Sequence, residues 1–303
     1  MMSRDKVIEF SGVAKSYGSR RVLEGFDLTV FRGNVYALLG ENGEGKTTAI
    51  KMAAGQMEPD AGAVRVFGLD PVRDGVRVRE RFAYVAELMK VYDWMTLAEL
   101  HDFLKPFYSN WNEDAFIRLT RGFGLPLDRK LGSFSRGMYA KSVLAAALCR
   151  EPELLILDDP CLGLDTASRR NFMEMLVDSL TGFGCTVFLS THLIPEAAGI
   201  VDRVGILKNG RLVAEEDAAA LLERTRLLRI PAGMEPQLPE LDVLRRKSCG
   251  PELLLTIRGD EEETGAELSR IPGLAFELEP LPLEEIFLAW TEKQEPRQED
   301  AAG

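Results

Sequence analysis

Residues 40–48 have the composition and spacing of a phosphate-binding loop. They read Gly-Glu-Asn-Gly-Glu-Gly-Lys-Thr-Thr, which matches the pattern G-x-x-x-x-G-K-[ST], and an apolar segment, residues 35–39, precedes them. In this pattern, backbone N–H groups surround phosphate oxygens at a helix N-terminus, where the helix dipole favours an anion. Lys46 is placed to reach the β- and γ-phosphates, and Thr47 to ligate Mg²⁺. The predicted nucleoside triphosphate site comprises Gly40, Glu41, Asn42, Gly43, Glu44, Gly45, Lys46, Thr47 and Thr48.

A second chemical signal lies in the middle of the chain. Residues 154–157 are apolar, and Asp158 and Asp159 follow them directly. An acid at the exposed end of a buried strand can hold Mg²⁺ opposite a phosphate-binding loop, which suits Asp158. Asp159 can accept a proton from an attacking water as a general base. Two acids that merely cap a strand are the alternative, which the phosphate-binding loop in the same domain disfavours.

Three short motifs complete the series. Residues 134–138 read Phe-Ser-Arg-Gly-Met and precede a helix-like segment. Residues 162–165 read Leu-Gly-Leu-Asp, and residues 190–192 read Ser-Thr-His. Together with the loop and the acid pair, these motifs have the order and spacing of the ATP-binding subunit of an ABC transporter, which residues 5–215 resemble. The ordered set makes a chance match implausible.

The resemblance implies roles for residues that carry no clear signal alone. Tyr17 lies where the family has an aromatic ring that stacks on adenine, and Glu87 where it has a glutamine that contacts Mg²⁺ and water. His192 resembles the histidine that hydrogen-bonds the γ-phosphate. Ser135 and Gly137 belong to the motif that closes on the nucleotide of a second subunit. The implied cofactors are ATP and Mg²⁺, with Asp159, His192 and Glu87 as catalytic residues and Thr47, Asp158 and Glu87 as metal ligands.

Several positions depart from the family pattern. Asp159 stands where the family has glutamate, and its carboxylate is shorter by one C–C bond, about 1.5 Å. Because a misplacement of about 1 Å can lower a rate on the order of 10²-fold, we expect slow hydrolysis. Glu87 adds negative charge beside the γ-phosphate. Arg136 replaces a glycine and either faces the opposite nucleotide or points to solvent, which we favour. The remaining departures are Met138, Cys161 and Leu162.

The elements that must position these motifs follow an α/β pattern. Continuous apolar segments at 154–157, 186–189 and 204–207 are typical of strands covered on both faces. Helix-like segments lie between such strands, which predicts an α/β domain with a largely parallel sheet. The resemblance specifies a P-loop NTPase fold with a RecA-like core sheet and an antiparallel β subdomain. Strand-like segments near the N-terminus are residues 7–10, 28–30 and 64–66.

Two further parts differ in composition from this core. Residues 88–140 are helical in pattern and rich in aromatic residues, and we expect an inserted helical subdomain with most aromatics in its core. Tyr92 and Trp94 either contact a permease or are buried under the subdomain. Residues 216–292 predict a small α+β domain, with strands at 227–231, 252–257 and 274–278 and a helix at 264–270. The polar tail, residues 293–303, is expected to be disordered.

The end of the α+β domain carries an apolar helix face. Ile286, Phe287 and Trp290 share this face, which either packs against its own domain or stabilises a dimer. The four cysteines, Cys149, Cys161, Cys185 and Cys249, are scattered and are expected to be reduced, buried thiols.

Composition bounds the partners and the location. Apolar residues make up 46% of the 303 residues, without an 18-residue apolar stretch or an apolar leader. We therefore expect a cytoplasmic chain, peripheral on the inner face of the cell membrane and bound to a separate transmembrane permease. A net charge of −11 argues against nucleic acid as a partner.

The leading hypothesis is an ATP-hydrolysing subunit that powers an ABC transporter through ATP-driven dimer closure. The one-cassette layout with a short C-terminal domain resembles exporter subunits, so export is favoured over import. The dimer is either a homodimer or a heterodimer in which this chain is the degenerate partner. A soluble ATP-switched regulator without a permease is the alternative from another class. A small-molecule kinase ranks lower, because it would not need the motifs at 134–138 and 162–165.

Overall fold

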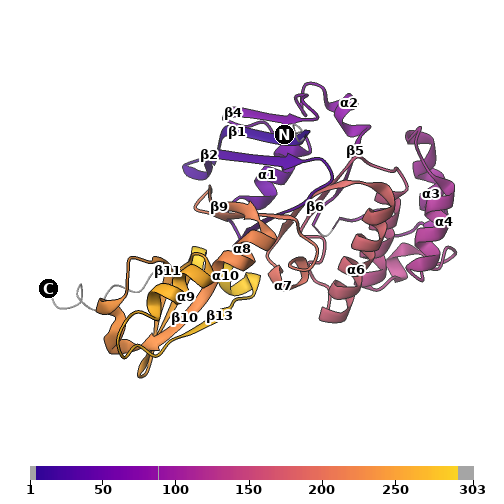
Figure 1. Cartoon of the computed structure of the whole chain (residues 1–303). Helices are drawn as coiled ribbons and strands as arrows, with labels where there is room; N and C mark the ends of the chain where they lie inside the picture. The colour runs from indigo at the N-terminus through magenta and orange to yellow at the C-terminus, as the bar shows by residue number, and fades with distance from the viewer. Residues whose placement is uncertain (1–4, 88, 293–303) are drawn as a thin grey trace. The chain divides into compact units, whose positions relative to one another are not determined.

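The computed structural model describes residues 5–87 and 89–292 of the chain, which divides into two compact units between Leu212 and Val213. Each unit is described by itself (Figure 1). The predicted domain boundary follows residue 215, and the predicted tail, residues 293–303, lies outside the described residues. Within the described ranges, no helix has both the length and the apolarity needed to cross a bilayer.

A mostly parallel sheet forms the centre of the first unit. Its strands have the order β5-β6-β7-β3-β8-β9, and the pairs β5–β6, β6–β7, β7–β3 and β3–β8 are parallel. The continuous apolar segments of the sequence form its buried strands, because both faces of the sheet are covered. The α/β prediction is therefore confirmed. The bounds are β3 Val35–Gly40, β5 Phe82–Val85, β6 Leu154–Asp158, β7 Thr186–Thr191, β8 Arg203–Lys208 and β9 Arg211–Asp217.

An antiparallel sheet lies over the helix that follows β3. This sheet has the order β2-β1-β4, and the helix, α1 (Lys46–Ala53), contacts both β4 and the core strand β6. Phe10 and Phe26 meet edge to face in the shared core, with ring centroids 5.2 Å apart. The strands of this antiparallel β subdomain are β1 Lys6–Tyr17, β2 Arg20–Phe31 and β4 Ala61–Val66.

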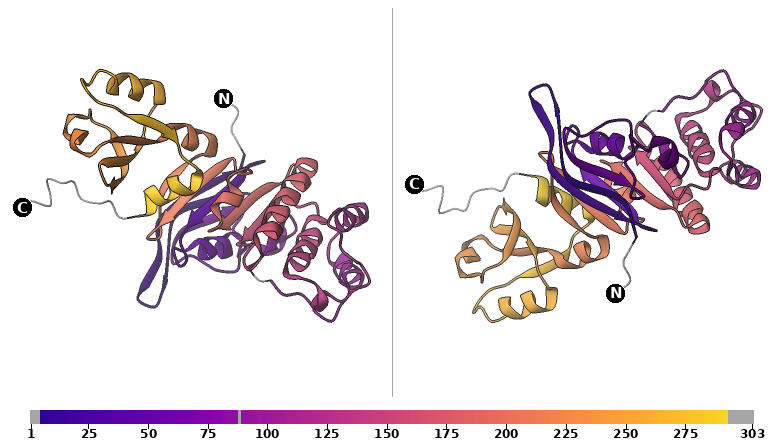
Figure 2. Two further views of the ribbon diagram at one scale, coloured as in Figure 1. Left: turned by 90° about the horizontal axis from the view of Figure 1, so that it is seen from below. Right: turned by 90° about the horizontal axis from the view of Figure 1, so that it is seen from above.

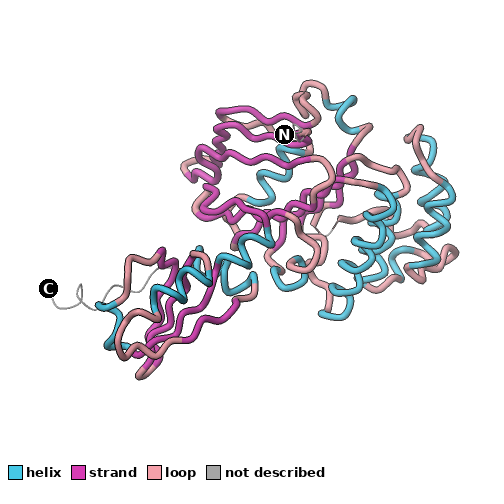
Figure 3. Tube along the Cα trace, viewed as in Figure 1, coloured by secondary structure: helices cyan, strands magenta, loops and turns pink. Residues whose placement is uncertain are grey.

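Helices form a subdomain of their own beyond β5. Thr96 and Glu99 form a capping box at the start of α3, and Asn112 caps α4. Figure 2 shows this helical part and the β1–β2 hairpin at opposite ends of the first unit. Figure 3 shows the helices and strands of the unit in different colours. The bounds are α2 Gly75–Arg79, α3 Leu97–Leu104, α4 Glu113–Gly122, α5 Arg136–Leu148, α6 Thr166–Phe183 and α7 Ile194–Ala197, with 3₁₀ turns at Lys105–Phe107 and Leu131–Ser133.

The expectation that most aromatics of this subdomain lie in its core is wrong for a group at its surface. Phe116 is buried, because it shares the inner face of α4 with Leu119. Tyr92 and Trp94 precede α3 and are not buried under the subdomain, whereas Leu97 and Leu100 of α3 are buried. The exposed fractions are 48% for Tyr92, 63% for Trp94, 40% for Phe103 and 68% for Phe107.

The second unit is an antiparallel sheet with helices. Its strand order is β11-β12-β10-β13, and its core contains Leu228, Leu255, Ile257 and Leu268. The predicted helix near 264–270 begins earlier, at α9, because Asp260 caps it. Strand β11 was not predicted, since its sequence contains Arg245-Arg246-Lys247-Ser248. The bounds are α8 Ala218–Arg224, β10 Thr225–Pro231, β11 Asp242–Cys249, β12 Glu252–Arg258, α9 Glu261–Leu268, β13 Glu277–Pro280 and α10 Leu283–Thr291, with a 3₁₀ turn at Ala232–Gln237.

Helix α10 contacts β11 of its own unit. Ile286 and Phe287 are buried, and Arg245 of β11 forms ion pairs with Glu285 and Glu292 at 3.2 and 2.7 Å. Of the two alternatives for this helix face, the contact with β11 supports packing against its own domain. Cys249 ends the same strand and is exposed, so the expectation of a buried thiol is wrong there, because β11 lies at the edge of its sheet.

Candidate functional site

The phosphate-binding loop connects β3 to α1 at the carboxyl end of the core sheet, the edge where α/β proteins bind ligands. Gly43 and Gly45 have φ values of 86° and 113°, which favour glycine. At Gly45, a Cβ atom would also lie 2.8 Å from Leu23 Cδ2. The buried Lys46 Nζ donates hydrogen bonds to the carbonyls of Gly40 and Glu41, at 2.7 and 3.0 Å. The loop therefore has the fold that the motif predicts.

Two hydroxyl groups meet the carboxylate of Asp158 behind the loop. Thr47 Oγ1 and Ser190 Oγ both donate to Asp158 Oδ1, at 3.0 and 2.7 Å. Burial raises the pKa of Asp158, and the two hydrogen bonds oppose this shift. Burial also lowers the pKa of Lys46, against the attraction of Asp159 and Asp158. The hydroxyl and carboxylate oxygens are the hard ligands that Mg²⁺ prefers.

Asp159 contacts His192 across the ends of β6 and β7. Its Oδ1 lies 2.9 Å from His192 Nδ1 and accepts a hydrogen bond from the His192 backbone N–H at 3.3 Å. Asp159 has a φ of 42°, the left-handed region, and its own N–H donates to the Ser190 carbonyl at 3.0 Å. The turn thus presents the carboxylate to the ring, and the predicted base and histidine are neighbours.

One cleft of about 550 Å³ collects most of the predicted residues. Glu87 lines this cleft from the end of β5, and Tyr17 lines it from the β1–β2 hairpin with its hydroxyl 3.1 Å from Met57 Sδ. Glu44 does not line the cleft, because its carboxylate accepts a hydrogen bond from the Asn209 N–H. The predicted residues that line the cleft are Tyr17, Asn42, Gly43, Gly45, Lys46, Thr47, Thr48, Glu87, Asp159 and His192.

Arg20 also lines this cleft and was missed. Its backbone pairs with Tyr17 across the hairpin, and its Nη2 donates to the Gly43 carbonyl at 3.0 Å. The sequence held one indication of this, because Arg20 lies close along the chain to Tyr17, which was predicted to bind the nucleotide. A role for Arg20 can be inferred only once the hairpin is known to reach the phosphate-binding loop.

Ser135 and Gly137 lie outside this cleft, at the start of α5. Ser135 caps the helix by accepting a hydrogen bond from the Met138 N–H at 3.2 Å. Gly137 allows a close approach to α6, since a Cβ atom there would lie 3.0 Å from Ser168 Oγ. The structure therefore does not bring this motif to the nucleotide cleft of its own chain.

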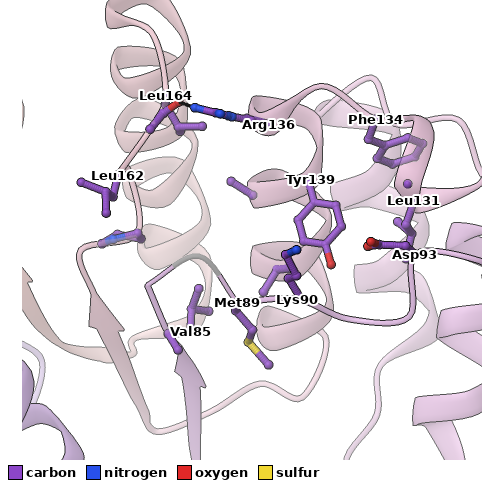
Figure 4. Close-up of a pocket in the computed structure, with 16 residues that line it drawn as sticks. Val85, Met89, Lys90, Asp93, Leu131, Phe134, Arg136, Tyr139, Leu162 and Leu164 are labelled. Atoms are coloured by element: carbon purple, nitrogen blue, oxygen red, sulfur yellow. Dashed lines mark hydrogen bonds between the residues drawn. The ribbon is translucent and has the colours of Figure 1, made fainter.

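Arg136 is exposed, but it has a protein partner. Its Nη1 donates to the Gly163 carbonyl at 3.3 Å, so the expectation that it only points to solvent is incomplete. Figure 4 shows this contact at the edge of a second cavity of about 660 Å³, with Leu162, Tyr139 and Lys90 in its wall. The contact joins the motif at 134–138 to the motif at 162–165 within one chain.

Comparisons with known proteins show which family the chain resembles. The family described as ABC transporter matches residues 23–162. The daunorubicin/doxorubicin resistance ATP-binding protein DrrA of Streptomyces peucetius is 34% identical over 94% of this chain and 92% of its own length. The Nod factor export ATP-binding protein I of Burkholderia lata is 31% identical over 95% of this chain and 97% of its own length.

Solved structures show the same fold for the first unit. A structure described as the ATP-binding subunit of an ABC transporter is 32% identical, with a TM-score of 0.63, and covers 71% of this chain and 91% of its own. The cbiO1 subunit of Clostridium perfringens is 23% identical, with a TM-score of 0.62 over 71% of this chain and 89% of its own, which concerns the fold alone.

Proposed function

Because this chain belongs to the ABC transporter family of ATP-binding subunits, we propose that it powers export across a membrane through ATP-driven closure of a dimer. The observation that carries the proposal is the Asp159–His192 pair, which lies in one cleft with Lys46 and Thr47. Drug resistance and Nod factor export in the names of its relatives support export over import. We place the chain on the cytoplasmic face of the membrane, bound to a separate permease.

The predicted residues of the cleft, together with Asp158 behind the loop, have separate parts in the proposed reaction. The loop N–H groups and Lys46 bind the phosphates. Thr47 and Asp158 would hold Mg²⁺, which would polarise the phosphates and offset their charge. Asp159 accepts the proton of the attacking water, and His192 orients the Asp159 carboxylate through the 2.9 Å contact. Glu87 and Tyr17 line the same cleft, where Glu87 would lie beside the metal and Tyr17 would stack on the adenine.

A second subunit is proposed because one chain does not complete the site. Ser135 and Gly137 lie outside the nucleotide cleft of their own chain, so we infer that they act on the nucleotide of a partner chain. A homodimer is the simplest arrangement, since each chain carries both halves of such a site. A heterodimer with a more active cassette is the alternative.

Phosphate release at different protein concentrations tests this proposal. We expect turnover per chain to rise with the concentration of the purified chain and then to reach a plateau, because hydrolysis needs two chains. The chain is diluted about a hundredfold, to a concentration below the Kd of the dimer. Turnover per chain that stays constant over this dilution would contradict the two-subunit site. A complete lack of turnover would contradict the homodimer and favour the heterodimer.

We also propose a docking surface for the permease on the helical subdomain. It is the aromatic ridge, defined as Tyr92, Trp94, Phe103 and Phe107, whose rings lie side by side. The ring centroid of Tyr92 is 5.8 Å from that of Trp94 and 5.5 Å from that of Phe103. The ring centroids of Phe103 and Phe107 are 5.5 Å apart. Contiguous exposed aromatics are typical of protein interfaces.

Replacing Trp94 by alanine is expected to lower recovery of the chain with its permease about tenfold, because buried tryptophans dominate binding energy at interfaces. The measurement is co-purification from detergent-solubilised membranes of cells that express both proteins. Ile117→Ala is the matched control, since Ile117 is exposed on α4 outside the ridge. Equal recovery of the Trp94 and Ile117 variants would argue against the ridge as the docking surface.

A further inference from the structure

A cation at the tip of the β1–β2 hairpin faces the phosphate-binding loop. Arg20 is the first residue of β2, and its register partner is Tyr17, the last residue of β1. Its Nη2 donates a hydrogen bond to the Gly43 carbonyl at 3.0 Å. The hairpin therefore delivers an aromatic ring and a guanidinium group to the same cleft, which both side chains line.

The hydrogen bond from Arg20 controls the direction of a loop N–H. In a trans peptide, the carbonyl of one residue and the N–H of the next point in opposite directions. Holding the Gly43 carbonyl toward Arg20 therefore fixes the direction of the Glu44 N–H. Within residues 5–87 and 89–292, that N–H makes a single long hydrogen bond, 3.4 Å to the Glu41 carbonyl, which a phosphate oxygen can replace. Loop N–H groups of this kind are the ones that bind phosphate.

The Arg20 hydrogen bond also fixes the loop at Gly43, where the backbone of a glycine has wide conformational freedom. Gly43 has a φ of 86° and lacks a side chain of its own to fix its position. A Cβ atom at Gly43 would lie 3.1 Å from Arg20 Nη2, so the guanidinium packs directly on this residue. On the other side of the loop, Asn209 donates its N–H to the Glu44 carboxylate. The two contacts hold the consecutive loop residues Gly43 and Glu44.

The charge of Arg20 is available to the nucleotide. The cleft is lined by the carboxylates of Glu87 and Asp159, which repel a triphosphate. Burial lowers the pKa of Lys46, which also lines the cleft, and the attraction of Asp159 and Asp158 opposes this shift. Across the described part of the chain, no carboxylate lies within ion-pair distance of Arg20. An arginine without a carboxylate partner is well suited to phosphate, since its charge is permanent and its donors form a rigid fork.

We propose that Arg20 is a positioning residue for the nucleotide. It holds the Gly43 carbonyl so that the Glu44 N–H is free to bind phosphate, and it adds positive charge on the phosphate side of an acidic cleft. The inference rests on the proposed function, because it presupposes a nucleotide in this loop. It requires neither the dimer nor the permease, so it is tested on the single chain.

The test compares the affinity for Mg-ADP, which is not hydrolysed, in four forms of the full chain. Arg20→Met keeps most of the aliphatic stem and removes the charge and the donors, and Arg20→Lys restores a cation. Arg21→Met is the matched control, because Arg21 is the next residue, pairs with Glu24 and does not line the cleft. Calorimetry gives the Kd of each form, and thermal unfolding shows whether the variant is folded.

We expect Arg20→Met to weaken Mg-ADP binding about tenfold, as for the loss of a charge-assisted hydrogen bond. Arg20→Lys should recover most of this loss, and Arg21→Met should stay within about twofold of wild type. A Kd of Arg20→Met within about twofold of wild type would overturn the proposal, as would an equal loss in Arg21→Met. If Arg20→Met does not fold, Arg20→Ala takes its place, and a Kd for Mg-ADP within about twofold of wild type in that variant would overturn the proposal. A wild-type chain that does not bind Mg-ADP would instead contradict the proposed function.

Discussion

Asparagine at position 159 is expected to stop ATP hydrolysis and to leave ATP binding nearly unchanged. The amide keeps the shape of Asp159 and can still accept the His192 N–H, but it cannot take a proton from water. Loss of a general base lowers rates by about 10²- to 10⁴-fold. Phosphate release and the Kd for Mg-ATP, both measured on purified Asp159→Asn, check the two parts of this result.

Glutamate at the same position is the informative companion to asparagine. Its additional methylene extends the carboxylate by about 1.5 Å, and we expect hydrolysis to rise several-fold. The melting temperature should fall slightly, because the φ of 42° at position 159 suits aspartate and asparagine better than longer side chains. An Asp159→Asn variant that keeps more than about a tenth of the wild-type rate would contradict the role of Asp159 as the base.

Methionine in place of Lys46 is expected to weaken Mg-ATP binding by about 100-fold or more. The Lys46 ammonium is buried in the loop, and the carbonyls of Gly40 and Glu41 hold it where the phosphates would lie. Removing it deletes charge-assisted hydrogen bonds of about 1.5–3 kcal/mol each and removes positive charge that offsets the carboxylates of the cleft. Titration calorimetry with Mg-ATP measures the loss.

Lys51→Met is the matched control for this variant. Lys51 lies on the same helix, near Asp158, but does not line the cleft. Its replacement should change the Kd for Mg-ATP by less than about threefold, as expected of a screened charge. If the Lys46 and Lys51 variants lose affinity equally, the nucleotide is not held by the loop as we propose.

The sequence predicts the core of the first unit well, because local pattern and tertiary environment agree there. Residues 154–157 are apolar without alternation, and the strand that they form is buried on both faces. Motif spacing also predicts that Lys46 and Asp159 belong to one cleft, since both follow the carboxyl ends of strands of one parallel sheet, β3 and β6, which β7 joins.

Other features depend on neighbours that are distant in the sequence. The exposure of Trp94 and Phe107, which flank α3, depends on the packing of the whole subdomain, and an aromatic residue has no local signal for this. Arg136 reaches Gly163 only because α5 begins beside that loop. Arg20 contacts Gly43 because the hairpin spans the distance between two sheets. Polar β11 was missed, because an edge strand needs little apolar surface.

The exposed thiol of Cys249 makes the second unit easy to observe in solution. Burial raises the pKa of Cys149, Cys161 and Cys185 to about 12, which keeps these three thiols protonated and shielded. A maleimide dye at neutral pH should therefore attach at a single position, on an edge strand far along the chain from the nucleotide loop. The native chain thus carries its own attachment point for a fluorescent reporter, and changes around β11 during ATP turnover can be followed without engineered cysteines.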